Sequence, residues 1–211
     1  MSAARYPGVI LAGGLATRMG GGDKSLHDLG GKPILAHVID RLRPQAGPIA
    51  LNANGDPARF ADLGLPVIAD SIEGFAGPLA GVLAGLDWAA ELGADTLVSV
   101  AADTPFFPTD LVARLDAART ETGHPIAMAA SPDGGRKSGL GRHPTFGLWP
   151  VGLRDDLRAA LTDGLRKVVL WTDRHGTATA LFDAPGPDPF FNVNTPEDLE
   201  LARARLTEGT A

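Results

Sequence analysis

Cysteine is absent from the 211-residue chain. Disulfide bonds, thiolate nucleophiles and thiolate-bound metals are therefore excluded, so any metal must bind to oxygen atoms or to histidine. The chain also lacks an apolar run approaching the roughly 20 residues that a membrane-spanning helix requires. The segment from Met1 to Pro7 has neither the charged nor the apolar region of a signal peptide. These absences lead us to expect a cytoplasmic protein without membrane contacts.

Aromatic residues are scarce, and 25 acidic residues against 19 Lys and Arg give a net charge of −6. This balance argues against a broad nucleic-acid-binding surface, whereas a local basic pocket can still hold a small anion. The apolar fraction of 44% is typical of globular proteins, and the length suits one substantial core. We find no repeat or linker and predict a single domain over residues 1–211, with disorder from Thr207 onward.

Strand and helix patterns alternate along most of the chain. Runs typical of strands lie at residues 9–12, 48–53, 65–69, 96–102, 126–130 and 143–149. Runs typical of helices lie at residues 33–42, 78–86, 111–115, 155–161, 164–171 and 196–206. The alternation predicts a three-layer α/β/α fold with a mainly parallel, Rossmann-like sheet, whose ligands bind at the carboxyl ends of the strands.

A glycine-rich loop follows the first strand in the segment Val9–Lys24, VILAGGLATRMGGGDK. Glycines allow a ligand to approach the main chain, and amide N–H groups with Arg18 and Lys24 are suited to hold several phosphates. The spacing is neither that of a Walker loop nor G-x-G-x-x-G. A flexible connector with two solvated charges is the alternative, which the buried strand before the loop disfavours. We therefore predict a triphosphate-binding loop.

Asp103 directly follows the run 96–102, TLVSVAA, which has the composition of a central strand buried on both faces. A carboxylate at the mouth of a central strand, beside a phosphate-binding loop, is placed to hold Mg²⁺ between protein and phosphate oxygens. The alternative is that Asp103 caps the next helix, but Thr109 or Asp110 is better positioned for that. We predict a magnesium site at Asp103.

Two polar side chains end the second and third strands. Asn52 can donate to and accept from the edge of a base, and the Asp70 carboxylate can accept two donors from guanine or ribose. An asparagine-rich turn is the alternative for this segment, and it suits Asn54 better than Asn52. Asp70 alternatively caps the turn that follows it.

The polar segment Ser131–Arg142 is predicted to be a loop, and it carries Arg136, Lys137 and Arg142. Two interpretations stay open: the cations cover the phosphate of a second substrate, or the loop is simply solvated. His143 comes next, and a lone histidine beside a strand is more often structural than catalytic.

The ordered set Gly13, Gly14, Arg18, Met19, Gly20, Asp23 and Lys24 resembles the signature loop of nucleotidyltransferases that activate sugars and cofactors, most closely the molybdenum cofactor guanylyltransferases. The resemblance continues to Leu199 through four later motifs. These are GPLAG at residues 77–81, DTPFFP at 103–108, HPTFGLW at 143–149 and NVNTPEDL at 192–199.

The resemblance implies transfer of GMP from GTP to the terminal phosphate of Mo-molybdopterin, giving the guanine dinucleotide cofactor and pyrophosphate, with Mg²⁺ as cofactor. It implies that Arg18, Lys24 and Asp103 are catalytic and that Asp103 binds the metal, with Asn192 or Asn194 completing the shell. The nucleotide-binding residues it implies are Leu11, Ala12, Gly13, Lys24, Asn52, Asp70 and Asp103. Because the acceptor phosphate is already ionised, the reaction needs no general base.

Two alternatives stay open. Asn and Asp side chains pair with either base, so a CTP-dependent molybdopterin cytidylyltransferase is the nearest one. A non-catalytic carrier of the molybdenum cofactor is the other, although a carrier has no need of Arg18, Lys24 and Asp103. The partners implied are proteins that deliver molybdopterin and chaperones that mature molybdoenzymes, with no nucleic acid.

Overall fold

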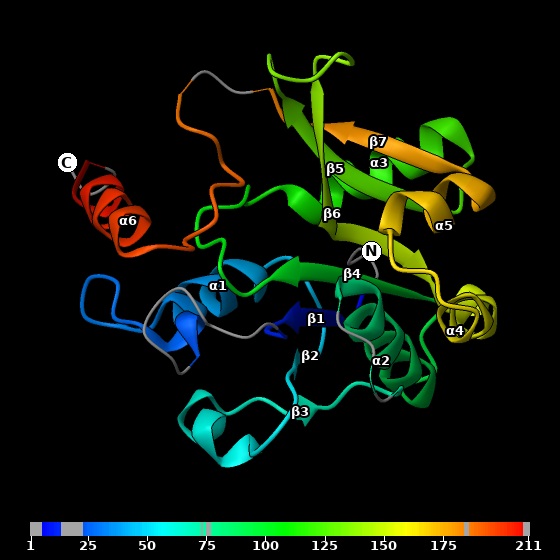
Figure 1. The fold of residues 1–211 in the computed structure, drawn as a ribbon, viewed down its shortest axis with the longest axis horizontal. Coiled ribbons are helices and arrows are strands. Elements are labelled where there is room, and N and C mark those ends of the chain that lie inside the picture. The colour runs from blue at the N-terminus through cyan, green and yellow to red at the C-terminus, as the bar shows by residue number, and fades with distance from the viewer. Residues whose placement is uncertain (1–5, 14–22, 73, 75–76, 184–185, 209–211) are drawn as a thin grey trace.

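The computed structural model describes residues 6–13, 23–72, 74, 77–183 and 186–208. These form one seven-stranded sheet in the order β3-β2-β1-β4-β6-β5-β7, which runs from the bottom to the top of Figure 1. The strands are β1 Gly8–Leu11, β2 Ile49–Asn52, β3 Val67–Ile68, β4 Thr96–Ala101, β5 Ile126–Pro132, β6 Leu140–Pro150 and β7 Thr177–Leu181. The helices are η1 Lys24–Leu26, α1 Ile34–Leu42, η2 Pro57–Leu63, α2 Pro78–Glu91, α3 Leu111–Thr122, η3 Val151–Leu153, α4 Arg154–Thr162, α5 Val168–His175 and α6 Pro196–Glu208.

The sheet is mainly parallel. β1 pairs in parallel with β2 and β4, β2 with β3, and β5 with β7, whereas β6 runs antiparallel between β4 and β5. Ile10 points to the face covered by α1 and α3, and its neighbours Val9 and Leu11 point to the face covered by α2, α4 and α5. The predicted three-layer α/β/α architecture is therefore confirmed.

The two strands that carry the predicted site lie in the middle of the sheet. All four residues of β1 and all six of β4 are buried, as expected for parallel strands covered on both faces. Their carboxyl ends point towards η1 and α6 in Figure 1. The residues that follow these strands are therefore held by a packed core.

Several predicted boundaries were wrong. Only residues 133–139 of the predicted loop Ser131–Arg142 connect strands, because β5 and β6 continue pairing up to Pro132 and Leu140. The helix expected over 164–171 begins only at Val168, after an extended Lys167. The strand expected over 65–69 is reduced to Val67–Ile68.

Two other local features differ from the sequence pattern. Pro33, expected as the first helical residue, takes the N-cap position of α1 with extended backbone. β7 was not predicted, because its sequence TATAL offers only small apolar side chains to the core. In both places the backbone conformation depends on residues from other parts of the chain, which the local sequence pattern does not reveal.

The start of α6 was predicted correctly. The backbone N–H of Asp198 donates to Thr195 Oγ1 over 3.1 Å, and Asp198 Oδ2 accepts from the N–H groups of Asn194 and Thr195. The helix includes Thr207 and ends at Glu208. No helix within the described ranges has both the length and the apolar character needed to cross a membrane.

Candidate active site

The carboxyl ends of β1, β2 and β4 meet at one edge of the sheet. Leu11 is in register with Asn52 on one side and with Ala101 on the other. The backbone N–H of Ala12 donates to the carbonyl of Asn52 over 2.9 Å. The backbone of Leu11, Ala12 and Gly13 is predicted to contact the nucleotide. These residues therefore lie beside the carboxyl ends of β2 and β4.

Lys24 joins three segments that are distant in sequence. Its Nζ lies 2.5 Å from Asp103 Oδ2 and 2.7 Å from Asn194 Oδ1. The side chains of Lys24 and Asp103 are 29% and 15% exposed, so their charges are only partly screened by water. Three predicted site residues are thus in direct contact.

Thr104 organises the other side of Asp103. Its buried hydroxyl lies 2.7 Å from Asn192 Oδ1 and 3.1 Å from Asp103 Oδ1. The N–H of Val193 also donates to the Asp103 carbonyl over 2.9 Å. The segment before α6 is therefore bonded to the loop that follows β4. Thr104 was not predicted as a site residue; its position directly after Asp103 is the signal that could have identified it.

The oxygen atoms collected here suit a hard cation. They come from the carboxylate of Asp103, the amides of Asn192 and Asn194, and the hydroxyl of Thr104. Mg²⁺ is commonly held by one or two carboxylates together with substrate phosphates and water. Among the residues that the structure describes, no cluster of three His, Asp or Glu side chains offers an all-protein metal site. The donor set therefore fits a magnesium ion shared with a nucleotide.

Asp70 is held by two asparagines at the end of β2. Asn52 is 2% exposed, and its Nδ2 donates to Asp70 Oδ1 over 2.9 Å and to the carbonyl of Ile68 over 3.2 Å. Asn54 Nδ2 donates to Asp70 Oδ2 over 2.8 Å, and Asn54 Oδ1 accepts from the Asp70 N–H. In this structure both amide hydrogens of Asn52 are used within the protein.

Asn54 is more than the turn residue that the sequence suggested. Its spacing from Asn52 is the signal that could have found it, because residues i and i+2 of an extended chain share a face. Both asparagines donate to the same carboxylate. The pair thereby fixes the orientation of Asp70.

Gly81, near the start of α2, allows this arrangement. A Cβ atom at Gly81 would lie 2.3 Å from Asn52 Oδ1 and 2.9 Å from Leu11 Cδ2. Real Cβ atoms essentially never show contacts below 3.0 Å, so a side chain at this position would force the Asn52 amide or the Leu11 side chain to shift. Its absent side chain leaves the room that the Asn52 amide occupies.

Arg136 and Arg142, singled out in the sequence, do not join this cluster. Arg18, with Gly14, Met19 and Gly20, lies outside the described residues. Arg136 Nε pairs with Asp133 Oδ2 at 2.9 Å, and Arg142 pairs with Asp173 at the same distance. The charges of these two arginines are thus compensated locally.

His143 has a structural environment. Its ring stacks on Phe190 with centroids 4.1 Å apart, and Nε2 lies 2.8 Å from Ser131 Oγ. Burial lowers the pKa of His143 below its ordinary value, which favours the neutral ring. This environment agrees with the structural interpretation of the residue.

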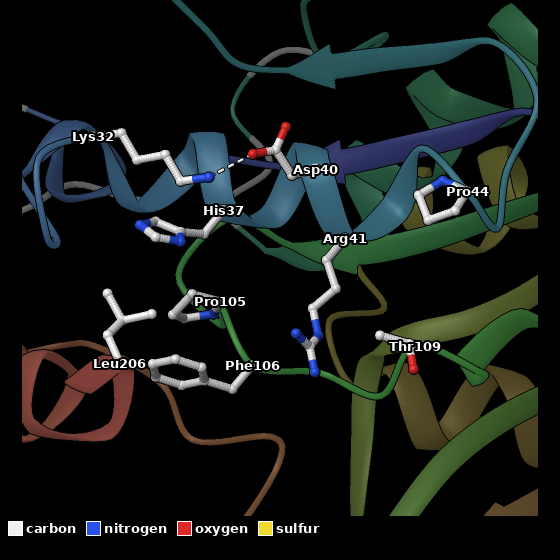
Figure 2. A pocket seen from close by; sticks show the side chains of 9 residues that line it. All are labelled: Lys32, His37, Asp40, Arg41, Pro44, Pro105, Phe106, Thr109 and Leu206. Carbon is white, nitrogen blue, oxygen red and sulfur yellow. Dashed lines mark hydrogen bonds and ion pairs between the residues drawn. The ribbon is translucent and has the colours of Figure 1, made fainter. Parts of the chain in front are cut away.

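A groove of about 310 Å³ lies between α1, α6 and the loop after Asp103 (Figure 2). It is lined by Lys32, His37, Asp40, Arg41, Pro44, Pro105, Phe106, Thr109 and Leu206. Lys32 Nζ lies 2.5 Å from Asp40 Oδ2, and Arg41 Nε donates to the carbonyl of Phe107. None of the predicted site residues lines it, so the groove is separate from the candidate site.

The chain is similar in sequence to known proteins. Residues 8–177 match the family described as the MobA-like NTP transferase domain. A molybdenum cofactor guanylyltransferase from Bradyrhizobium sp. (strain ORS 278) is 56% identical over 199 residues, which cover 93% of this chain and 91% of the relative. The protein of the same name from Rhodopseudomonas palustris (strain HaA2) is 58% identical, with 93% and 90% covered.

A solved structure shares the fold. The crystal structure of molybdopterin-guanine dinucleotide biosynthesis protein A from Archaeoglobus fulgidus matches with a TM-score of 0.70 and 20% identity, covering 96% of this chain and all of that one. At this identity the likeness extends to the fold alone. The Rossmann-like nucleotidyltransferase architecture predicted from the sequence is therefore confirmed.

Proposed function

Because this chain belongs to the family of MobA-like NTP transferase domains, we propose that it is a molybdenum cofactor guanylyltransferase. It transfers GMP from GTP to the terminal phosphate of Mo-molybdopterin and releases pyrophosphate. The observation that carries this proposal is the contact of Lys24 with Asp103 and Asn194 at the carboxyl ends of the central strands. Relatives more than half identical over nine tenths of the chain are named for this activity.

The chemistry is a single in-line displacement. An oxygen of the molybdopterin phosphate forms a bond to the α-phosphorus of GTP, and the bond from that phosphorus to the pyrophosphate oxygen breaks. The attacking phosphate is ionised at neutral pH, so no side chain has to remove a proton. The protein contributes by positioning the two phosphates and by neutralising their charge.

Lys24 is assigned to the charge that builds on the leaving pyrophosphate, together with Arg18. The main chain of Leu11, Ala12 and Gly13 is assigned to the nucleotide. In the free protein the Lys24 amine is bonded to Asp103 and Asn194. Nucleotide phosphates are acceptors of the same kind and would replace them.

Asp103, with the amide oxygen of Asn192 or Asn194, would hold Mg²⁺. When bound, the ion would supply positive charge that neutralises the phosphates. Lys24, which is bonded to Asp103 in the free protein, would then be available to the phosphates.

Asp70 is assigned to the nucleoside, with Asn52 and Asn54 as its supports. A carboxylate held by two amides can accept two N–H donors side by side, such as those of guanine, or two ribose hydroxyls. Cytosine also offers an N–H donor, so the CTP-dependent enzyme is the alternative to be tested. A non-catalytic carrier of the cofactor is disfavoured, since such a protein does not require the bonded pair of Lys24 and Asp103.

Calorimetric titration with GTP and with CTP, each with and without Mg²⁺, tests the proposal. We expect GTP to bind more tightly than CTP, and to bind more weakly when Mg²⁺ is withheld. The direct assay is formation of the guanine dinucleotide from GTP and Mo-molybdopterin, monitored through the pyrophosphate released. Preference for CTP would assign the cytidylyl reaction instead, and binding of neither nucleotide would support the carrier.

The remaining proposals concern the compartment in which the enzyme acts and the molecules it contacts. We place it in the cytoplasm, where GTP is available. Its two substrates are GTP and Mo-molybdopterin. Proteins that deliver molybdopterin and chaperones that insert the finished cofactor into molybdoenzymes are the partners that this reaction calls for. Co-purification with a molybdopterin-carrying protein would test that assignment.

A further inference from the structure

One guanidinium group connects the two halves of the candidate site. Arg59, on η2 between β2 and β3, places Nε 2.6 Å from Asp23 Oδ2. Its Nη2 donates to the carbonyl of Asn54 over 2.5 Å, and its Nη1 donates to the carbonyl of Asp56 over 3.1 Å. All three nitrogens of the group are therefore bonded to protein oxygens.

The backbone around Arg59 is shaped to hold it. Asp56 caps η2 by accepting from the N–H of Ala58, and Pro57 follows as a favourable first helical residue. Gly55 has φ +86°, and a Cβ there would lie 2.9 Å from Arg59 Nη1. The guanidinium also lies over the ring of buried Phe60, 4.7 Å from its centroid. This environment fixes the direction of the side chain.

Asp23 directs its carboxylate to Arg59 instead of to the helix that follows it. It occupies the N-cap position of η1, yet its side chain makes no capping hydrogen bond there. The carboxylate is 22% exposed and paired with Arg59. Lys24 is the next residue, so this ion pair fixes the point from which the Lys24 side chain starts towards Asp103.

Asn54 forms the other end of the connection. Its carbonyl accepts from Arg59, while its side chain accepts from the Asp70 N–H and donates to the Asp70 carboxylate. Arg59 therefore touches the neighbour of the phosphate-binding lysine and the support of the nucleoside-binding carboxylate. A lysine could not do this, because a single ammonium lacks the planar, forked geometry.

We propose that Arg59 is a positioning residue for nucleotidyl transfer, which acts through Asp23 on Lys24 and through Asn54 on Asp70. This inference rests on the proposed function and deepens it. Arg59 does not touch the nucleotide; it keeps the phosphate-binding and nucleoside-binding side chains at the separation that one bound nucleotide requires. Its bonds are made in the free protein, so the site is arranged before the nucleotide arrives.

The test compares three variants with two partial ligands. Inorganic pyrophosphate probes the Lys24 side, and guanosine probes the Asp70 side. Asp23→Asn should weaken pyrophosphate binding and spare guanosine, and Asn54→Ala should do the reverse. Arg59→Gln should weaken both, and should weaken GTP binding in the presence of Mg²⁺ by roughly tenfold or more, the usual effect of losing an outer supporting group.

A double variant separates positioning from general destabilisation. If Arg59 acts on the phosphate side through Asp23, Arg59→Gln combined with Asp23→Asn should bind pyrophosphate no more weakly than Arg59→Gln alone. Multiplied effects would overturn the inference. Arg43→Gln, at the exposed end of α1, is the matched control and should bind GTP like the wild type.

Arg59→Lys keeps the positive charge and guards against a folding artefact in the glutamine variant. We expect it to fold and still to bind both partial ligands more weakly than the wild type. Wild-type binding by Arg59→Lys or Arg59→Gln would overturn the inference while leaving the proposed function intact. Failure of the wild-type protein to bind GTP would instead reject the proposed function itself.

Discussion

The Lys24 ammonium lies 2.5 Å from the Asp103 carboxylate, so the proposed phosphate-binding cation and metal-binding anion neutralise each other in the free protein. Separating them in the absence of substrate would leave two poorly hydrated charges. A nucleotide that brings both phosphates and Mg²⁺ gives each a new partner of opposite charge. The pair therefore favours binding of nucleotide and metal together over either alone.

Lys24→Ala is expected to lower kcat by about 10²–10³-fold, the cost typical of removing one charge-stabilising group from an active site. The cause is the loss of positive charge at the leaving pyrophosphate. Circular dichroism should show that the variant is folded, because Lys24 lies at the edge of the hydrophobic core and its removal leaves the core packing intact. Lys167→Ala, at an exposed position before α5, is the matched control. A wild-type rate in Lys24→Ala would reject the role of the lysine.

Asp103→Ala is expected to abolish most turnover and to remove the dependence of GTP binding on Mg²⁺. The carboxylate is the charged oxygen ligand available to the ion in this cluster, and amide or hydroxyl oxygens alone bind Mg²⁺ weakly. Titrations with and without Mg²⁺ measure the effect, with Asp163→Ala at an exposed position after α4 as the control. GTP binding by Asp103→Ala that still strengthens with Mg²⁺ would place the ion elsewhere.

Gly81→Ala is expected to weaken GTP binding and to lower the free energy of unfolding by about 1–3 kcal/mol, the usual cost of overpacking. The new methyl group would lie 2.3 Å from Asn52 Oδ1, so Asn52 must move and release Asp70. Urea denaturation and GTP titration measure the two effects. Gly152→Ala, where a Cβ meets nothing within 4 Å, is the control. An unchanged Gly81→Ala protein would show that Asn52 can move without consequence.

Acidification below about pH 6.5 is expected to destabilise the protein partly through His143. Burial lowers the pKa of His143 below the ordinary 6.5, so the unfolded chain binds the proton more readily than the folded one. The stabilising contribution is complete above pH 6.5 and is lost as the pH falls towards the folded-state pKa. His37, whose pKa burial also lowers, adds to the same trend.

Urea denaturation at about pH 7.5 and about pH 5.5, on either side of the histidine titration, measures this dependence. His143→Gln should lose less stability between the two values than the wild type, because the buried titrating group is gone. The exposed His124→Gln serves as the control and should retain the wild-type loss. Equal losses in His143→Gln and the wild type would assign the dependence to other groups.

The alternation of apolar runs was sufficient to predict the three-layer sheet, because burial on both faces of parallel strands leaves a strong local pattern in β1 and β4. The same argument predicted that the polar residues after those strands share one edge, where Lys24 and Asp103 are in contact. Asn194, which the family resemblance implied, joins them there. Sequence alone therefore determined the kind of fold and the chemical groups at the strand ends. Local order and side-chain chemistry carry that information directly.

Only the tertiary structure decided which of those groups bond to one another. Asn194 reaches Lys24 across 170 residues of sequence, and Arg59 reaches Asp23 from η2, because the sheet order and the direction of each side chain bring them together. The sequence around Asn194 and around Arg59 does not indicate which residue either side chain bonds to. The antiparallel course of β6 and the existence of β7 were likewise decided by their neighbours in the sheet, since short strands owe their stability to the partners that they pair with.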